Sequence, residues 1–168
     1  RQVDHHLARA RAVGRRGHAH SRAKVWKSLT AVERAVGRLY PHVRIDIDGD
    51  KDAVASVERQ DLDEMIGNLV ENAAKYGGGS VFVTVEVRDG LVRRRSEDDG
   101  RGIPEKDRQR MFDRGARLDS GKPGTGLGLA IVRDVAEIYE GSVSLEESED
   151  LGGLLVRLRL PKSEMSLT

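Results

Sequence analysis

The strongest constraint on the fold is a strand–turn–strand pattern near the middle of the chain. Valine occupies every second position from Val81 to Val87, so an extended segment there has one apolar face and one polar face. Asp89 and Gly90 follow, a dipeptide that favours the tight turn of a β-hairpin, and Leu91 begins the returning strand. The pattern predicts an antiparallel strand pair that needs another layer on its apolar side.

The flanking segments supply that layer and further strands. Apolar residues at helical spacing predict helices over 26–39, 61–76 and 129–139, and alternating runs predict strands over 43–47, 54–57, 142–146 and 154–160. Asp61 and Glu64 have the spacing of a capping box, so we expect Asp61 to cap the second helix. A short helix is expected around 108–114, and the glycine-rich stretch 119–128 is expected to be flexible. The fold class is α+β.

Composition restricts the kind of protein. The 168 residues suit one domain with an appendage, and a formal net charge of +1 argues against nucleic acid as a partner. The chain has no cysteine and therefore no thiolate chemistry. No apolar run approaches the roughly 18 residues of a membrane span. Because the chain opens with Arg1 rather than Met, we expect a fragment of a larger protein.

Residues 1–24 differ from the rest of the chain. Seven lysines and arginines face one acidic residue, Asp4, and four of the five histidines lie here. A membrane- or nucleic-acid-binding arm and a metal site are alternatives, but no carboxylate or cysteine cluster completes a metal site. We favour a helix end followed by a linker through Gly14 and Gly17, with the folded domain over 25–164.

Two asparagines lie one turn apart on the helix predicted over 61–76. Asn68 and Asn72 share one face, although each asparagine costs roughly 0.6 kcal/mol in a helix interior relative to alanine. One interpretation is a solvated polar face, shared with Glu71 and Lys75. The other is a ligand site, because an amide offers an oxygen to a cation and an N–H donor to a phosphate. Such a pair suits a Mg²⁺–triphosphate site, where the metal takes few protein ligands.

Two glycine-marked segments follow in the chain. In "EDDGRGIP", residues 97–104, Asp98 comes at a strand end, and the glycines free the backbone to approach a ligand; a surface turn is the alternative. A buried carboxylate there could accept a hydrogen bond from an exocyclic amine such as that of adenine. In "GKPGTGLGLA", residues 121–130, Gly124, Gly126 and Gly128 precede a helix and present N–H groups to an anion. This loop fits neither the Rossmann fingerprint nor the Walker loop.

Taken together and in this order, the segments resemble the ATP-binding catalytic domain of sensor histidine kinases, within the wider group of gyrase-, Hsp90- and MutL-like ATPases. "NLVENAAKYG" is similar to the N box of that family, "DDGRGI" to its first glycine box, "MFDRGAR" to its F box and "GTGLGLAIV" to its second glycine box. The stretch "FDRGARLDSGKPGTGLGLA" resembles PhoQ-type kinases. The resemblance implies a two-layer α/β sandwich (a Bergerat-type ATP-binding fold), with a mixed sheet of about five strands packed on about three helices.

The resemblance also implies a role for individual residues. Asn72 matches the Mg²⁺ ligand and Asn68 a phosphate- or metal-side contact, while Lys75 and Tyr76 match phosphate- and adenine-side positions. Asp98 matches the acceptor for the adenine amine, with Gly100, Gly102 and Ile103 beside it. Two basic residues match a mobile lid near the γ-phosphate, and a backbone cradle follows them: Arg117 and Lys122, then Gly124, Thr125, Gly126, Leu127, Gly128 and Leu129.

The residue at position 68 favours the kinase branch of this group. Water-splitting members have a glutamate four residues before the metal-binding asparagine, and a glutamate can act as a general base toward water. Asn68 cannot, and Glu71 points about 100° away from Asn72 on a helix. The site is therefore expected to hold ATP and Mg²⁺ for a separate nucleophile, with Asn68, Lys75, Arg117 and Lys122 acting in the transfer.

The resemblance implies partners that this chain lacks. The family transfers the γ-phosphoryl group to a histidine on a dimeric helical hairpin and then to a response regulator. No acceptor histidine with the expected neighbours is present, and "HHLARAR" resembles the end of the second dimerisation helix. We therefore expect a monomeric, cytoplasmic fragment that does not phosphorylate itself. A regulatory module that binds nucleotide without phosphotransfer and an anti-sigma-type serine kinase remain alternatives.

Two departures from the family pattern lie close to Asp98. Arg101 replaces a proline that is common in the first glycine box. If Asp98 points into the pocket, strand alternation turns Ser96 and Arg94 the same way, where family members carry apolar residues. An inward Arg94 would cost several kcal/mol unless it is paired or reaches solvent. Either this strand lies near a sheet edge, or the domain is destabilised.

Overall fold

The computed structural model describes residues 21–112 and 128–163 of the chain. Its elements, in chain order, are β1 (Ala23–Lys24), α2 (Val25–Leu39), β2 (Arg44–Gly49), β3 (Val54–Ala55), α3 (Arg59–Tyr76), β4 (Ser80–Arg88), β5 (Leu91–Asp98), α4 (Glu105–Arg108), the 3₁₀ helix η1 (Gln109–Phe112), α5 (Gly128–Ile138), β6 (Ser142–Glu147) and β7 (Leu154–Pro161).

The main sheet has five strands in the order β2-β4-β5-β7-β6, so β5 lies at its centre. β2 pairs with β4 in parallel, and the other neighbours are antiparallel, which makes the sheet mixed. The predicted hairpin is confirmed: Arg88 pairs with Leu91, and both Asp89 and Gly90 have positive φ, as a tight two-residue turn requires. The hairpin therefore builds the centre of the sheet.

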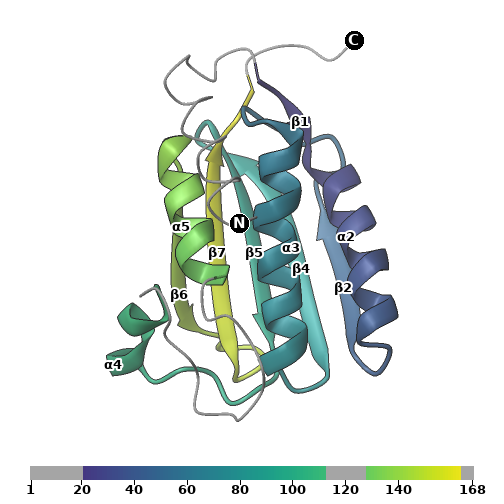
Figure 1. Cartoon of the computed structure of the whole chain (residues 1–168), viewed down its shortest axis with the longest axis vertical. Helices are drawn as coiled ribbons and strands as arrows, with labels where there is room; N and C mark the ends of the chain where they lie inside the picture. The colour runs from purple at the N-terminus through teal and green to yellow at the C-terminus, as the bar shows by residue number, and fades with distance from the viewer. Residues whose placement is uncertain (1–20, 113–127, 164–168) are drawn as a thin grey trace, which may run out of the picture.

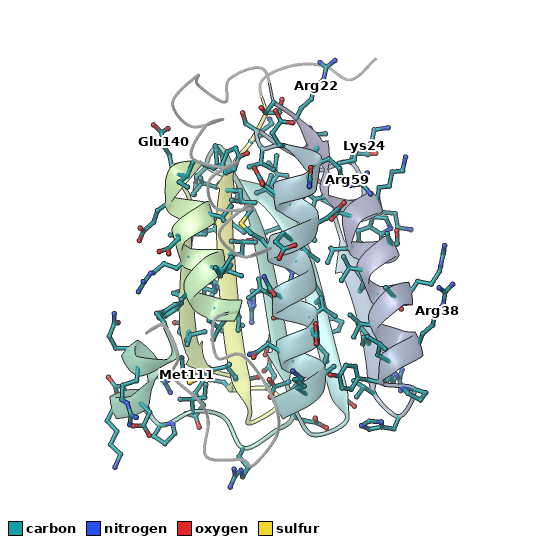
Figure 2. All side chains as sticks on the ribbon, in the orientation of Figure 1. Arg22, Lys24, Arg38, Arg59, Met111 and Glu140 are labelled. Atoms are coloured by element: carbon teal, nitrogen blue, oxygen red, sulfur yellow. The ribbon has the colours of Figure 1, made fainter. Side chains whose placement is uncertain are left out.

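Three helices cover one face of this sheet, with α3 in the middle and α2 and α5 on either side (Figure 1). The alternating valines of β4 point into this interface, where Val81, Val83 and Val85 are buried. The outer surface of the helix layer is polar; Arg38, for example, points away from α2 into solvent (Figure 2). The structure confirms the expected α+β class and the two-layer sandwich.

The opposite face of the sheet carries mostly polar side chains. In its middle, β5 and β7 place Arg93 opposite Arg159 and Arg95 opposite Arg157. Carboxylates accompany three of these arginines: Arg93 with Asp89, Arg95 with Glu97, and Arg157 with Glu146. We call this surface the open face of the sheet.

A small second sheet closes one end of the sandwich. β1 pairs with β3, with Ala23 opposite Ala55. The end of β7 joins the same place, since the Ser56 amide donates to the Pro161 carbonyl and the Ser163 amide donates to the Val54 carbonyl. β1 was not predicted, because two residues carry no periodic signal. Both described ends of the chain thus meet at β3.

Two details of the predicted elements differ. The expectation that Asp61 caps its helix is wrong: α3 begins at Arg59, and its N-cap residue Glu58 makes no side-chain capping bond. Asp61 instead lies buried in the first turn and accepts a hydrogen bond from the Tyr139 hydroxyl, so tertiary packing fixes this helix end. The short helix expected around 108–114 is found earlier, as α4 followed by η1, within the residues described.

None of the helices in the described ranges combines the length and the apolar character that a membrane crossing requires.

Candidate functional site

A pocket that is open to solvent lies where the second half of α3 meets the end of β5 and the start of β7. α3 and the strands form its opposite walls, and the loop after β5 closes one side. Its lining is mainly apolar with a few polar groups, the usual character of a small-molecule site. The lining residues are Leu69, Asn72, Ala73, Ser96, Asp98, Gly102, Ile103, Leu154 and Val156.

The two asparagines of α3 face different parts of this site. Asn72 lines the pocket. Asn68, one turn earlier, lies beside the first residue of α5: a Cβ built on Gly128 would be 3.7 Å from the Asn68 Oδ1 atom. The polar face of α3 is therefore covered on one side by the N-terminus of α5, which is where helix N–H groups favour an anion.

Asp98 forms the polar end of the strand wall and is 6% exposed. Its Oδ1 atom accepts hydrogen bonds from the Gly100 amide at 2.9 Å and the Leu154 amide at 3.2 Å. Its Oδ2 atom makes no hydrogen bond within the described ranges. Burial raises the pKa of the Asp98 carboxyl, and the two amides oppose that rise. Backbone donors thus fix one oxygen and leave the other available to a ligand.

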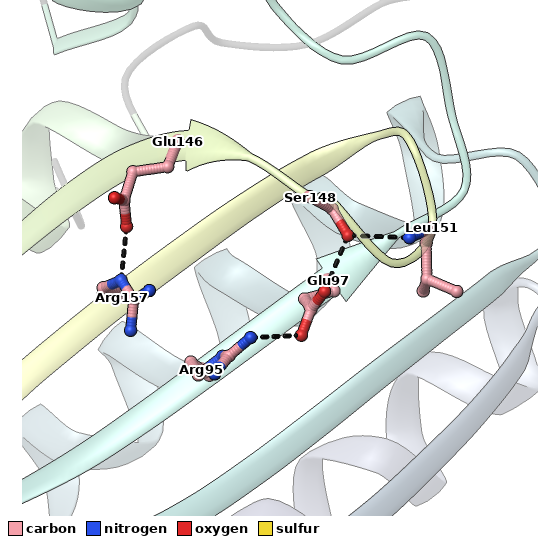
Figure 3. A network of polar contacts seen from close by, with 6 residues as sticks. All are labelled: Arg95, Glu97, Glu146, Ser148, Leu151 and Arg157. Carbon is pink, nitrogen blue, oxygen red and sulfur yellow. Dashed lines mark hydrogen bonds and ion pairs between the residues drawn. The ribbon is translucent and has the colours of Figure 1, made fainter.

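The turn between β6 and β7 is held against Asp98 from both faces of the sheet. On the open face, the Ser148 hydroxyl donates to Glu97 at 2.6 Å, and the Leu151 amide donates to Ser148 (Figure 3). On the helix face, Leu154 donates to Asp98. Gly153 approaches so closely that a Cβ there would lie 2.2 Å from Asp98 Oδ1. Only glycine fits at position 153, so the position of the Asp98 carboxylate depends on the conformation of this turn.

The neighbouring Asp99 serves a different purpose from Asp98. Its Oδ1 atom accepts hydrogen bonds from the Gly79 and Ser80 amides at 2.8 and 3.0 Å, and these bonds lower the pKa of its carboxyl. Asp99 therefore ties the start of β4, just past the end of α3, to the end of β5. The pair of aspartates in "DDG" divides into one residue that faces the pocket and one that holds its walls together.

The other expected site residues fall into three groups. Gly102, with φ of +72°, and Ile103 line the pocket, and Gly100 supports Asp98. Lys75 does not line it and forms an ion pair with Glu71 at 3.8 Å, while Leu129 packs in the core. Tyr76 is the last residue of α3. The remaining expected residues lie outside the described ranges: Arg117, Lys122, Gly124, Thr125, Gly126 and Leu127.

Arg94 is buried in the core behind the pocket. It is 2% exposed and lies on the central strand, opposite Val85 of β4 and Leu158 of β7. The inward orientation expected from alternation is confirmed, and the alternative that this strand lies near a sheet edge is wrong. Its Nη1 donates to the Ser96 hydroxyl at 3.3 Å, while Nε and Nη2 have no partner. Burial lowers the pKa of the Arg94 guanidinium to about 10.

Motif matching alone did not identify several lining residues. Leu69 and Ala73 share a face of α3 with Asn72, and Leu154 and Val156 come from β7. The apolar stripe of α3 and the alternation of β7 were visible in the sequence, but the antiparallel pairing of β5 with β7 was not. Contacts between distant strands decide which apolar residues reach the pocket.

A mixed five-stranded sheet covered on one face by three helices, with a buried aspartate and an asparagine facing one pocket, is the architecture of Bergerat-type ATP-binding domains. The family model described as "Histidine kinase-, DNA gyrase B-, and HSP90-like ATPase" matches residues 57–164. The chain belongs to this family.

Similar proteins place the chain among domains of the histidine kinase type. The sensor protein kinase CarS of Pseudomonas aeruginosa is 44% identical over 121 residues, which cover 72% of this chain and 27% of CarS. The two-component sensor PhoQ of the same organism is 36% identical over 160 residues, covering 94% of this chain and 35% of PhoQ. The chain thus spans only a part of each relative.

Solved structures agree on the fold. The ATP-binding domain of PrrB from Mycobacterium tuberculosis superposes with a TM-score of 0.71 at 28% identity, covering 84% of this chain and 96% of that domain. The mycobacterial sensor histidine kinase MprB gives a TM-score of 0.76 at 24% identity, covering 86% of this chain and all of that one.

Proposed function

We propose that this chain is the ATP-binding catalytic module of a two-component sensor histidine kinase. It transfers the γ-phosphoryl group of ATP to a histidine on a dimerisation hairpin of the parent protein. One observation carries the proposal: Asn72 and Asp98 face the same pocket from opposite walls, while Asn68 lies beside the N-terminus of α5.

The pocket residues divide between the two ends of the nucleotide. At the base end, the free Oδ2 of Asp98 accepts a hydrogen bond from the adenine amine, while Ile103, Leu154 and Val156 provide apolar surface for the ring. At the phosphate end, the Asn72 amide oxygen is suited to a Mg²⁺ ion that is otherwise held by phosphate oxygens and water. A bound Mg²⁺ would neutralise charge on the phosphates during transfer.

Around the phosphates, α3 is proposed to supply positive charge from Lys75 and no general base for water from position 68. Lys75 lies one turn after Asn72 and is proposed to contact a phosphate; its ion pair with Glu71, at 3.8 Å, is partly exposed, and such pairs contribute little to stability. Arg117 and Lys122 are proposed to add positive charge. Asn68 cannot take a proton from water, and Glu71 does not line the pocket. The site is suited to positioning ATP for an external nucleophile rather than to hydrolysis.

The parent protein is proposed to resemble its relatives. CarS and PhoQ are sensor kinases, and PhoQ is a two-component sensor. We infer a histidine-bearing dimerisation domain in the same parent chain, a response regulator as the final acceptor, and a cytoplasmic location for this domain. Residues 1–24 are proposed to connect it to the dimerisation helices.

The direct test is binding of a non-hydrolysable ATP analogue, measured calorimetrically with Mg²⁺ and with EDTA. We expect Asn72→Ala to weaken binding by tenfold or more in Mg²⁺, and to have a much smaller effect in EDTA, because only the metal-linked contact is lost. Gln60→Ala, an exposed change on the same helix, is the matched control and should bind as the unchanged chain does. Equal affinity of the Asn72→Ala variant in Mg²⁺ would contradict the proposed metal site.

A second experiment separates the kinase from a module that only binds nucleotide. The chain is mixed with labelled ATP, Mg²⁺ and a histidine-bearing hairpin taken from a PhoQ relative. Transfer of label to that histidine supports the kinase. Nucleotide binding without transfer to this hairpin favours the regulatory module, and label on a serine of an added substrate favours the anti-sigma type.

A further inference from the structure

Ser96 lies on the floor of the pocket with an unusual neighbour behind it. It is 2% exposed, lines the pocket two residues before Asp98, and accepts a hydrogen bond from the buried Arg94. Within the described part of the chain, the Ser96 hydroxyl has no other hydrogen-bond partner. Its hydrogen is therefore available to an acceptor that enters the pocket.

The buried pair of Arg94 and Ser96 lowers the stability of the fold, so packing of the core alone does not explain these two residues. Arg94 has no carboxylate partner among the described residues, and two of its nitrogens make no hydrogen bond. A buried charge without a partner is strongly unfavourable, and an aliphatic side chain in its place would pack without that cost. Such violations of core chemistry are expected mainly where a ligand uses them.

We propose that Ser96 contacts the base of the bound nucleotide by donating to a ring nitrogen, and that Arg94 is the positioning residue that directs this donation. The inference rests on the proposed function, since it names a further contact in the same pocket.

The hydrogen-bonding chemistry of the two side chains explains why Ser96 donates to the ligand and Arg94 only positions it. A serine hydroxyl has one hydrogen to donate and lone pairs that accept. Because the guanidinium of Arg94 is a donor only, it occupies a lone pair of Ser96 and leaves the hydrogen directed elsewhere. Asp98, two residues along the same strand face, presents a free carboxylate oxygen. One acceptor and one donor thus line the same wall.

This arrangement complements one edge of adenine. That edge presents an amine hydrogen beside the ring nitrogen N1, which is an acceptor. With the amine at Asp98, N1 faces the side of the pocket where Ser96 donates. A 6-oxopurine in the same orientation would place a carbonyl against the Asp98 carboxylate and an N–H against the serine hydrogen, so it would be rejected at both positions.

The test compares ADP with 1-deaza-ADP, in which a C–H replaces N1, and with 7-deaza-ADP as the control ligand. Affinities are measured by displacement of a fluorescent ATP analogue. For the unchanged chain we expect 1-deaza-ADP to bind roughly tenfold more weakly than ADP, as for the loss of one hydrogen bond. In Ser96→Ala that difference should fall below about twofold, because the donor is absent. Ser144→Ala, on the open face, should keep the full difference.

Arg94→Met tests the positioning role separately. It should raise the melting temperature, because a buried charge is removed, and still reduce the discrimination against 1-deaza-ADP. A higher melting temperature with unchanged discrimination would overturn the role given to Arg94. Equal affinity of the unchanged chain for ADP and 1-deaza-ADP would overturn the contact of Ser96 with N1. Failure of the unchanged chain to bind any of these nucleotides would instead overturn the proposed function.

Discussion

Arg94 and Asp98 lie on the same face of one strand, carry opposite charge, and form no ion pair with each other in the structure. Each side chain is therefore buried without the other as a charge partner. Burial lowers the pKa of Arg94 from its ordinary value to about 10, which corresponds to roughly 3 kcal/mol against the charged form. Burial also raises the pKa of Asp98. The central strand therefore holds charge in the core at a cost to folding.

Removing that cost should stabilise the domain. We expect Arg94→Ile combined with Ser96→Val to raise Tm by about 5–10 °C, followed by circular dichroism on heating. Since the pKa of Arg94 is lowered, the penalty is fully present below about pH 10 and is relieved only as pH rises further, so the gain should be the same at pH 6 and pH 8.

Arg93→Ile is the matched control, because Arg93 is the next residue but lies on the open face. Any gain from Arg93→Ile should be smaller and should shrink at high salt, because it would come from relieving repulsion with Arg159 and not from removing a buried charge. An unchanged or lower Tm for the double variant would mean that Arg94 is compensated in a way that its hydrogen bonds do not reveal.

For individual residues, motifs predicted part of the pocket lining. Asn72, Asp98, Gly102 and Ile103 came from spacing and resemblance, and the structure brings them together. Strand alternation from Asp98 also placed Arg94 inside. It did not indicate what the guanidinium contacts, because the direction of a long side chain along a strand depends on packing from neighbouring elements.

Among the elements, the turn between β6 and β7 has a larger part in the site than its sequence suggests. Glu97 and Asp98 are adjacent and point to opposite faces, and each is bonded to this turn. These two hydrogen bonds fix the position of the turn relative to the pocket. Its sequence, "SEDLGG", reads only as a polar loop.

Ser148→Ala tests this connection. The change leaves one oxygen of the buried Glu97 without its partner, so we expect a loss of about 1–3 kcal/mol in the free energy of unfolding, measured with urea. Ser144→Ala, in the neighbouring strand, serves as control and should cost much less because its bond to Arg159 is partly exposed. Comparable losses in both variants would show that the turn is not held by Glu97.

Element boundaries show where local signals were overridden. The capping pattern at Asp61 failed because Asp61 is used by Tyr139 of the segment after α5, a contact between residues far apart in the chain. The hairpin turn at Asp89 and Gly90 was predicted correctly because its backbone geometry is decided by those two residues alone. The sequence therefore predicts a turn whose geometry depends on its own residues, but it does not predict a helix end that is fixed by a tertiary contact.

For the molecule as a whole, the layer class followed from periodicity, but the strand order did not. Nothing in the sequence indicated that β2 runs parallel to β4 or that β7 is inserted between β5 and β6. These arrangements come from non-local pairing. One of their results is that four arginines of two non-consecutive strands face one another on the open face.

Like charges directly opposite in a sheet are destabilising, and salt screens them. We expect Arg159→Gln to raise Tm by a few degrees at low ionic strength and by less at high salt, because Arg159 bonds to Ser144 and has no carboxylate partner among the described residues. Arg38→Gln, at the end of α2, should have the opposite sign because a cation favours a helix C-terminus. Identical shifts for both variants at both salt concentrations would exclude repulsion on the open face as the cause.

The junction at β3 has a mechanical consequence. Tension applied between residues 21 and 163 would load the few hydrogen bonds that join β1 and β7 to β3. The pocket lies at the far end of β5, about 23 Å away along the strand. A force applied through the chain ends would therefore separate the strands at β3 first, and the end of the domain that holds the pocket would be loaded last.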